Sequence, residues 1–487
     1  MKKMVIAAAG LMAFLVMKEV PVLAAEGDDG RIVSVDELQS DFSALYEGLQ
    51  RAHVNLYAHR DRASYDSLYA EMLASFNRPL SLFETKVKFQ KFVAYGNVAH
   101  ARVPFPEEDY RAFRDGGGLN FPIYPRIVDG RVFVGEDYSG HEDINPGDEI
   151  LTLNGEPMAY WLDRAASNIS ADTDYIAHSL LEFSLPQYLW LELGEVPYFD
   201  LTLRSGGGQS RTVRVAATSR ETQAKEAEKQ PAQFSLSAAE RTAKMLDGGI
   251  AYLRPGPFYN AENPEDVWNN DAFVAFIDAA FETFIEAGAT QLVIDLRDNP
   301  GGDRSFSDPM LAWFADRPFR FSSAFLVRSS EEAAASNQAR LDASPGASEG
   351  ISGQYAQKYA EVPRGEVFDF DIAYTQPREG ERFDGDVYVL VNRHSFSNAV
   401  TVAAMVQDYG FGTIAGEKTS DMATTYGAME NFTLPATGIS VGFPKAHIIR
   451  PSGETEADGV TPDWLIPSPV APAETDVVLE ALLDRLR

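Results

Sequence analysis

The spacing of apolar positions divides the chain into regions with different predicted structures. In residues 31–103 apolar side chains recur every three or four positions, which predicts an N-terminal region of two or three packed helices. Glycine and asparagine interrupt this period in residues 95–100, so His100 is expected on a turn after a helix. Two serine–glutamate pairs have capping-box spacing and mark expected helix starts: Ser34 with Glu37, and Ser81 with Glu84.

The period changes twice more along the chain. In residues 115–217 it falls to two, with short apolar runs bounded by glycines, which predicts a small β-rich domain. That domain carries a long helix-patterned insertion between Gly155 and Phe199. From 236 to 487 apolar strands alternate with helical segments, as in an α/β layer structure. Residues 331–354, rich in alanine, serine and glycine, are expected to form an exposed excursion from this domain.

Residues 1–25 have the pattern of an export signal. Lys2 and Lys3 precede an apolar run at 4–17, and small residues lead to an expected cleavage site near Ala24 or Ala25. The run is shorter than the roughly 20 residues that span a membrane. An uncleaved anchor is the alternative. We expect a soluble bacterial protein, periplasmic or secreted, with no stable membrane insertion once the signal is removed.

Composition narrows the possible chemistry. The chain has 487 residues, 42 of them basic and 72 acidic, for a net charge of −30, and this acidity disfavours nucleic acid as a partner. It has no cysteine, which excludes disulfides, thiolate metal sites and a cysteine nucleophile. The seven histidines show no paired helical spacing, so we predict no metal site and no cofactor.

Two strand-to-turn junctions carry candidate chemistry. In residues 291–303 the apolar run LVIDL leads into RDNPGG, a turn whose free N–H groups could bind a developing anion; an ordinary strand-to-helix turn is the alternative. In residues 387–409 the strand VYVLVN leads through RHSFSN into a helix, which places Ser397 at a helix N-terminus. Ser395 or Ser397 could instead only cap that helix.

Taken together, these motifs resemble a known family. LVIDLRDNPGG, followed by VYVLVNRHSFSNAVTVAAMVQDYG and TIAGEKT, resembles the tail-specific, or carboxyl-terminal processing, serine peptidases and their tricorn-core and retinoid-binding-protein-like relatives. INPGDEILTLNG at 144–155 and GLNF at 118–121 resemble PDZ domains. The resemblance implies a ClpP/crotonase-like α/β catalytic domain behind a helical N-terminal region and a PDZ-like domain. Gly118, Leu119 and Phe121 would then hold a peptide's terminal carboxylate.

The family pattern also assigns roles to residues of this chain. Ser397 falls on the nucleophile position, and the N–H groups of Gly301 and Asn398 fall on the oxyanion-hole positions, with Gly302 as the alternative to Gly301. In the processing peptidases a lysine is the general base, but Met422 occupies that position here. The usual serine–lysine dyad is therefore missing, and the chain resembles the tricorn-core and retinoid-binding-protein-like branch more than the serine–lysine branch.

A serine hydroxyl needs another base to become a nucleophile. His100 is the preferred candidate, because its setting resembles that of the catalytic histidine in tricorn-type relatives, although Ala99 replaces the usual preceding serine. Glu456 matches the glutamate that orients this histidine. Lys418 and then Lys445 are the alternative bases, since a buried lysine loses proton affinity.

The predicted function is hydrolysis of protein or peptide substrates through an acyl-enzyme on Ser397. The alternative is a catalytically inactive homologue that binds a peptide or an apolar ligand on the same scaffold. The oligomeric state is open.

Overall fold

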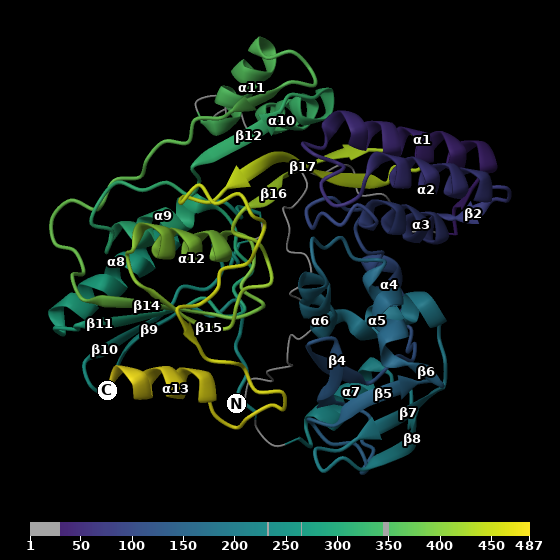
Figure 1. Ribbon diagram of the computed structural model, residues 1–487, viewed down its shortest axis with the longest axis horizontal. Coiled ribbons are helices and arrows are strands. Elements are labelled where there is room, and N and C mark those ends of the chain that lie inside the picture. The colour runs from purple at the N-terminus through teal and green to yellow at the C-terminus, as the bar shows by residue number, and fades with distance from the viewer. Residues whose placement is uncertain (1–29, 231–232, 264, 344–349) are drawn as a thin grey trace.

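The computed structural model describes residues 30–230, 233–263, 265–343 and 350–487, which form a mixed α/β molecule (Figure 1). The predicted signal, residues 1–25, lies outside the described residues. Among the helices of the described segments, none is both long and apolar enough to cross a membrane.

The N-terminal region is helical. Both capping boxes are confirmed: the Ser34 side chain accepts from Glu37 N–H and the Ser81 side chain from Glu84 N–H, with reciprocal contacts from each glutamate. The apolar faces of these helices pack on a four-stranded sheet of order β13-β12-β17-β16. The elements are β1 (Ile32–Val33), α1 (Val35–Ala52), α2 (Arg62–Ser75), β2 (Leu80–Ser81), α3 (Leu82–Ala94), β12 (Ala324–Arg328), β13 (Val367–Asp369), β16 (Thr425–Thr433) and β17 (Ser440–Ile449).

The stretch expected as an exposed excursion packs onto the same sheet instead. It forms α10 (Glu331–Ala343) and α11 (Ile351–Glu361), and Ala333 and Asn337 of α10 are buried. Arg340 of α10 pairs with the buried Glu430 of β16 at 2.6 Å. These tertiary contacts stabilise a segment that its composition alone predicts to be an exposed excursion.

The second region is β-rich and carries two helices in its insertion. Its main sheet has the order β3-β4-β5-β7-β8, with β6 paired to β5, and α6 lies against the edge strand β3. The elements are α4 (Glu107–Asp115), β3 (Ile123–Val128), β4 (Arg131–Asp137), β5 (Glu149–Leu153), β6 (Glu156–Pro157), α5 (Met158–Ala166), α6 (Asp174–Leu193), β7 (Tyr198–Arg204), β8 (Ser210–Ala216) and α7 (Arg220–Ala227).

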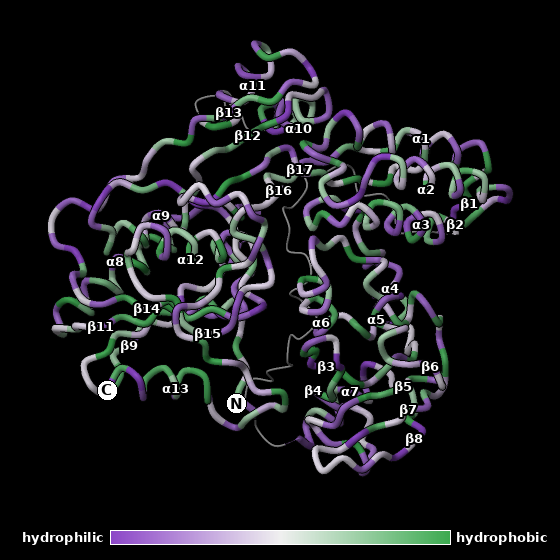
Figure 2. The backbone as a smooth tube through the Cα atoms, viewed as in Figure 1, coloured by the Kyte–Doolittle hydropathy of each residue, from purple (hydrophilic) through white to green (hydrophobic). Residues whose placement is uncertain are grey.

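The C-terminal region is built on a six-stranded sheet of order β18-β15-β14-β11-β10-β9, parallel except for β9. Its strands are largely apolar (Figure 2), because α8, α9 and α12 cover one face and α13 the other. The elements are β9 (Thr242–Leu246), β10 (Ile250–Arg254), α8 (Asp271–Glu286), β11 (Gln291–Asp295), α9 (Arg304–Ala312), β14 (Asp386–Val391), α12 (Asn398–Tyr409), β15 (Thr413–Gly416), β18 (Trp464–Leu465) and α13 (Val477–Leu486).

The pairing of β11 with β14 places the two candidate motifs side by side. These neighbouring strands are parallel, with Asp295 opposite Leu390 at their carboxyl ends. The loops that leave such ends emerge at the same edge of the sheet. The glycine turn at 298–302 and the turn before Ser397 therefore meet there.

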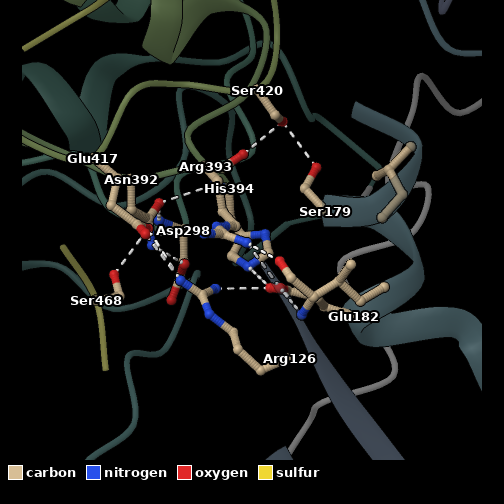
Figure 3. A network of polar contacts seen from close by, with 12 residues as sticks. Arg126, Ser179, Glu182, Asp298, Asn392, Arg393, His394, Glu417, Ser420 and Ser468 are labelled. Atoms are coloured by element: carbon tan, nitrogen blue, oxygen red, sulfur yellow. Dashed lines mark hydrogen bonds and ion pairs between the residues drawn. The ribbon is translucent and has the colours of Figure 1, made fainter. Parts of the chain in front are cut away.

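A buried charge network joins this edge to the second region (Figure 3). Arg126 on β3 and Arg393 in the turn before Ser397 each bridge Glu182 on α6 and Glu417, at 2.8–3.0 Å. Burial opposes the charge on Glu417, but the two guanidiniums lower its pKa below the usual value. His394 also contacts Glu182, and burial together with the two arginines lowers its pKa to about 3. His394 is therefore a neutral structural residue.

Removing one charge from this network is expected to destabilise the protein. Glu182→Ala leaves two buried guanidiniums with one carboxylate, so we expect a loss of about 3 kcal/mol in the free energy of unfolding. Urea titrations of wild type and Glu182→Ala measure this difference in unfolding free energy. The control is Glu221→Ala on the exposed helix α7, which should leave the midpoint unchanged. Equal midpoints for wild type and Glu182→Ala would show that the network does not hold the regions together.

Candidate functional site

Ser397 lies at the start of α12 in a strained backbone conformation. Its φ is 52° and its ψ is −122°, a combination that non-glycine residues rarely adopt. It occupies the N-cap position, but its side chain makes no capping hydrogen bond. Ser395, in contrast, is buried and its hydroxyl donates to Leu296 O at 2.7 Å. Ser395 is thus structural, whereas the Ser397 hydroxyl is not used to cap the helix.

Gly301 approaches Ser397 more closely than any other residue type would allow. A Cβ atom on Gly301 would lie 2.6 Å from Phe396 O, 2.7 Å from Asn398 N and 2.8 Å from Ser397 Cβ. The φ of Gly301 is also positive, at 85°. Two independent constraints, space and backbone conformation, therefore require glycine at this turn.

The N–H groups around Ser397 differ in what they bind. The Gly301 N–H donates to Asn299 Oδ1 at 2.9 Å, and Asn299 is itself held by a hydrogen bond to Gly256 O. The N–H groups of Gly302 and Asn398 have no hydrogen-bond acceptor within the described part of the chain. The Asn398 N–H belongs to the first turn of α12, where the helix dipole favours negative charge.

His100 comes to the same place from the N-terminal region. It follows α3 in a turn where Asn97 has a φ of 51°, as the interrupted periodicity indicates. Its ring stacks on Phe396, the neighbour of Ser397, with centroids 6.2 Å apart. The buried Nδ1 of His100 has no hydrogen-bond partner among the described residues, and no hydrogen bond between the Ser397 hydroxyl and His100 is found there.

A carboxylate that the sequence analysis did not select, Asp421, completes this group. It is 1% exposed, and its Oδ2 accepts the Ser397 N–H at 2.6 Å while its Oδ1 accepts the Met422 N–H. Burial raises the pKa of Asp421, and the nearby His100 opposes that rise. Asp421 directly precedes Met422, so an acidic residue beside the expected base position was the available sequence signal.

The other predicted carboxylate and bases lie in different surroundings. Glu456 is exposed, and no hydrogen bond or ion pair joins it to His100 among the residues described. Lys418 pairs with Asp458 at 2.5 Å on the surface. Lys445 is buried in a pair with Glu430 at 2.7 Å, and burial lowers its pKa.

The predicted carboxylate-binding loop is closed by contacts within the chain. The Leu119 N–H donates to Glu195 Oε1 at 2.9 Å, and the Gly118 N–H donates to Phe113 O. The Phe121 N–H donates to the neighbouring Asn120 side chain. A peptide carboxylate would therefore compete with Glu195 for the Leu119 N–H.

The arrangement at Ser397 has the parts that acyl transfer requires. It combines a serine hydroxyl that does not cap the helix, an imidazole, a buried carboxylate and main-chain N–H donors at a helix N-terminus. Across the described segments, no group of three or more histidine, aspartate or glutamate side chains could hold a metal ion.

Gly301→Ala tests the close approach that forms this site. The added methyl group would overlap Phe396 O and Asn398 N, so we expect a loss of about 3 kcal/mol in unfolding free energy. Gly288→Ala is the matched control, since Gly288 also has a positive φ, 66°, but open space around it. It should lose only about 1 kcal/mol. Urea titrations compare the two, and equal losses would mean that the approach is not tight.

Comparisons with known proteins bear on this arrangement. Residues 266–466 match the family model of Peptidase family S41. The structure of mature CPAF complexed with lactacystin is 16% identical to this chain, covers 93% of it and 97% of its own length, and has a TM-score of 0.62. A CPAF mutant has the same identity and TM-score. The photosystem II D1 C-terminal processing protease is 17% identical, with coverage of 88% and 93% and a TM-score of 0.43.

No curated protein matches the chain. The likeness to CPAF extends over nearly the whole of both chains, so the fold is shared beyond the family domain. Within that fold, the matched segment contains both the glycine turn and Ser397. Residues 266–466 therefore form a domain of peptidase family S41, and the chain is a serine-type peptidase.

Proposed function

We propose that this protein is an exported bacterial peptidase, periplasmic or secreted, that cleaves peptide bonds through an acyl-enzyme on Ser397. The observation that carries the proposal is the Ser397 backbone, held at a φ of 52° with its hydroxyl free of any capping role. A strained serine between a strand and a helix N-terminus is typical of an exposed nucleophile. The export pattern of residues 1–25 supports the location.

In this mechanism Ser397 Oγ attacks the scissile carbonyl as His100 takes its proton. His100 later returns that proton to the leaving amine, and water hydrolyses the ester. The two side chains must come within hydrogen-bond reach for this transfer, and such contacts commonly tighten only when substrate binds. The phenylalanine next to Ser397 already stacks on the His100 ring.

The oxyanion would be held by main-chain donors. The Asn398 N–H lies at the start of α12 and has no acceptor among the residues that the structure describes. The family pattern assigns the second donor to Gly301, whose N–H must then be shared with Asn299 Oδ1. Gly302 is the alternative, since its N–H has no acceptor within the described segments.

Two carboxylates are candidates to stabilise the imidazolium that forms on His100. Family resemblance favours Glu456, whose side chain is exposed here. Geometry favours Asp421, which is buried and accepts the Ser397 N–H, and which lies close enough to His100 for that side chain to oppose the rise in the Asp421 pKa. We propose Asp421, because a buried charge interacts with an imidazolium far more strongly than an exposed one.

The substrate is proposed to be a protein or peptide. The second region would bind an extended chain, with Gly118, Leu119 and Phe121 near its carboxyl end. Because Glu195 already accepts the Leu119 N–H, a substrate carboxylate must displace it.

Ser397→Ala and His100→Ala should each lower kcat by about 10³-fold or more on an unfolded protein substrate. Wild type should be labelled by a fluorophosphonate probe at Ser397, as located by peptide mass mapping. Ser210→Ala, at an exposed serine of the second region, should behave as wild type. Full activity in Ser397→Ala would refute the assignment, and absence of any labelling in wild type would favour a binding protein.

Asp421→Asn and Glu456→Gln separate the two carboxylates. We expect Asp421→Asn to lower kcat by about 10²- to 10⁴-fold, since the amide keeps the shape but loses the charge that stabilises the imidazolium. Glu456→Gln should stay within about threefold of wild type. Steady-state kcat and KM provide the comparison. A large loss in Glu456→Gln with an active Asp421→Asn would assign the role to Glu456.

A further inference from the structure

The side chain of Asp172, in the insertion of the second region, contacts the turn that carries His100. Asp172 lies between α5 and α6, and α6 is on the side of this region that faces the C-terminal region (Figure 1). The Asp172 side chain is only 3% exposed. Its Oδ2 accepts the Ala99 N–H at 3.0 Å, and its Oδ1 lies 3.2 Å from His59 Nε2.

The main-chain N–H groups of three residues anchor the backbone on either side of His100. Ala101 N–H donates to Val98 O within the turn, and Arg102 N–H donates to Gly442 O of β17. The third anchor is the bond from Ala99 N–H to Asp172, and it is the one made by a side chain. An ionised carboxylate makes this bond stronger than a neutral acceptor would.

Within the described segments, few contacts fix the direction of the His100 ring. Its buried Nδ1 has no hydrogen-bond partner within the described residues, and its ring stacks on Phe396. The placement of the ring therefore depends on the backbone that carries it. Asp172 also lies close enough to Asp421 to raise the pKa of that carboxyl. Asp172 therefore interacts electrostatically with a residue next to Ser397 as well as with the His100 turn.

We infer that Asp172 is a positioning residue for His100, supplied by the second region. The inference rests on the proposed function, in which His100 is the base. The side chain of Ala99 cannot form a hydrogen bond. Here the main-chain N–H of Ala99 donates a hydrogen bond to the Asp172 carboxylate.

The test compares Asp172→Ala with Asp172→Asn in the full-length protein. Asp172→Ala removes the acceptor, so the His100 turn is free to shift, and a shift of about 1 Å can cost about 100-fold in rate. We expect kcat and the rate of fluorophosphonate labelling to fall 10- to 100-fold, with KM within threefold. Asp172→Asn keeps an oxygen acceptor and should stay within fivefold of wild type. The control is Asp174→Ala, an exposed carboxylate two residues away.

Hydrogen exchange reports the positioning without relying on activity. Amide protection in the peptide covering residues 96–103 should fall in Asp172→Ala and persist in Asp172→Asn and Asp174→Ala. Loss of protection together with lower kcat supports the inference. Wild-type labelling and kcat in Asp172→Ala would overturn it while leaving the proposed function intact. No labelling of Ser397 in wild type would instead refute the proposed function, and the inference with it.

Discussion

The site depends on one close approach between two loops at the edge of a parallel sheet. Because β11 and β14 are neighbours, their carboxyl ends place the glycine turn directly against Ser397. At 2.6–2.8 Å from the position of a Gly301 Cβ, the atoms of residues 396–398 leave no space for a side chain. This contact brings the main-chain N–H groups of the glycine turn close to Ser397. Without it, the N–H groups at the start of α12 would be the main-chain donors near the Ser397 hydroxyl.

The rest of the site reaches this edge from other parts of the molecule. His100 comes from the turn after α3, Asp421 from the loop after β15, and Asp172 from the insertion of the second region. The network of Arg126, Glu182, Arg393 and Glu417 joins that region to the turn just before Ser397 (Figure 3). A buried network of this kind adds little net stability, but it strongly disfavours arrangements that leave one charge unpaired. The position of the second region and the conformation of the Ser397 turn are therefore linked.

Features with a local cause could be predicted from the sequence. The capping serines, the strand before the glycine turn and the junction at Ser397 depend on residues within a few positions of one another, and the structure has each of them. The turn at His100 belongs to the same class, because its glycine and asparagine end α3.

Features that depend on tertiary contacts could not be predicted in this way. The alanine-rich stretch expected to be exposed forms α10 and α11, because β16 supplies Glu430 as a buried partner for Arg340. Asp421 and Asp172 carry no motif of their own, and only the fold brings them near His100. The role of Glu456 stays a prediction from resemblance, since no local pattern shows which carboxylate reaches a histidine more than 300 residues away.

A crystal structure of the protein with a phosphonate bound to Ser397 Oγ would test this account most directly. The account predicts that one phosphonyl oxygen lies about 2.7–3.1 Å from the Asn398 N–H and from one glycine N–H of the 301–302 pair, with the His100 ring beside Oγ. A phosphonyl oxygen that points into solvent, away from these N–H groups, would contradict it.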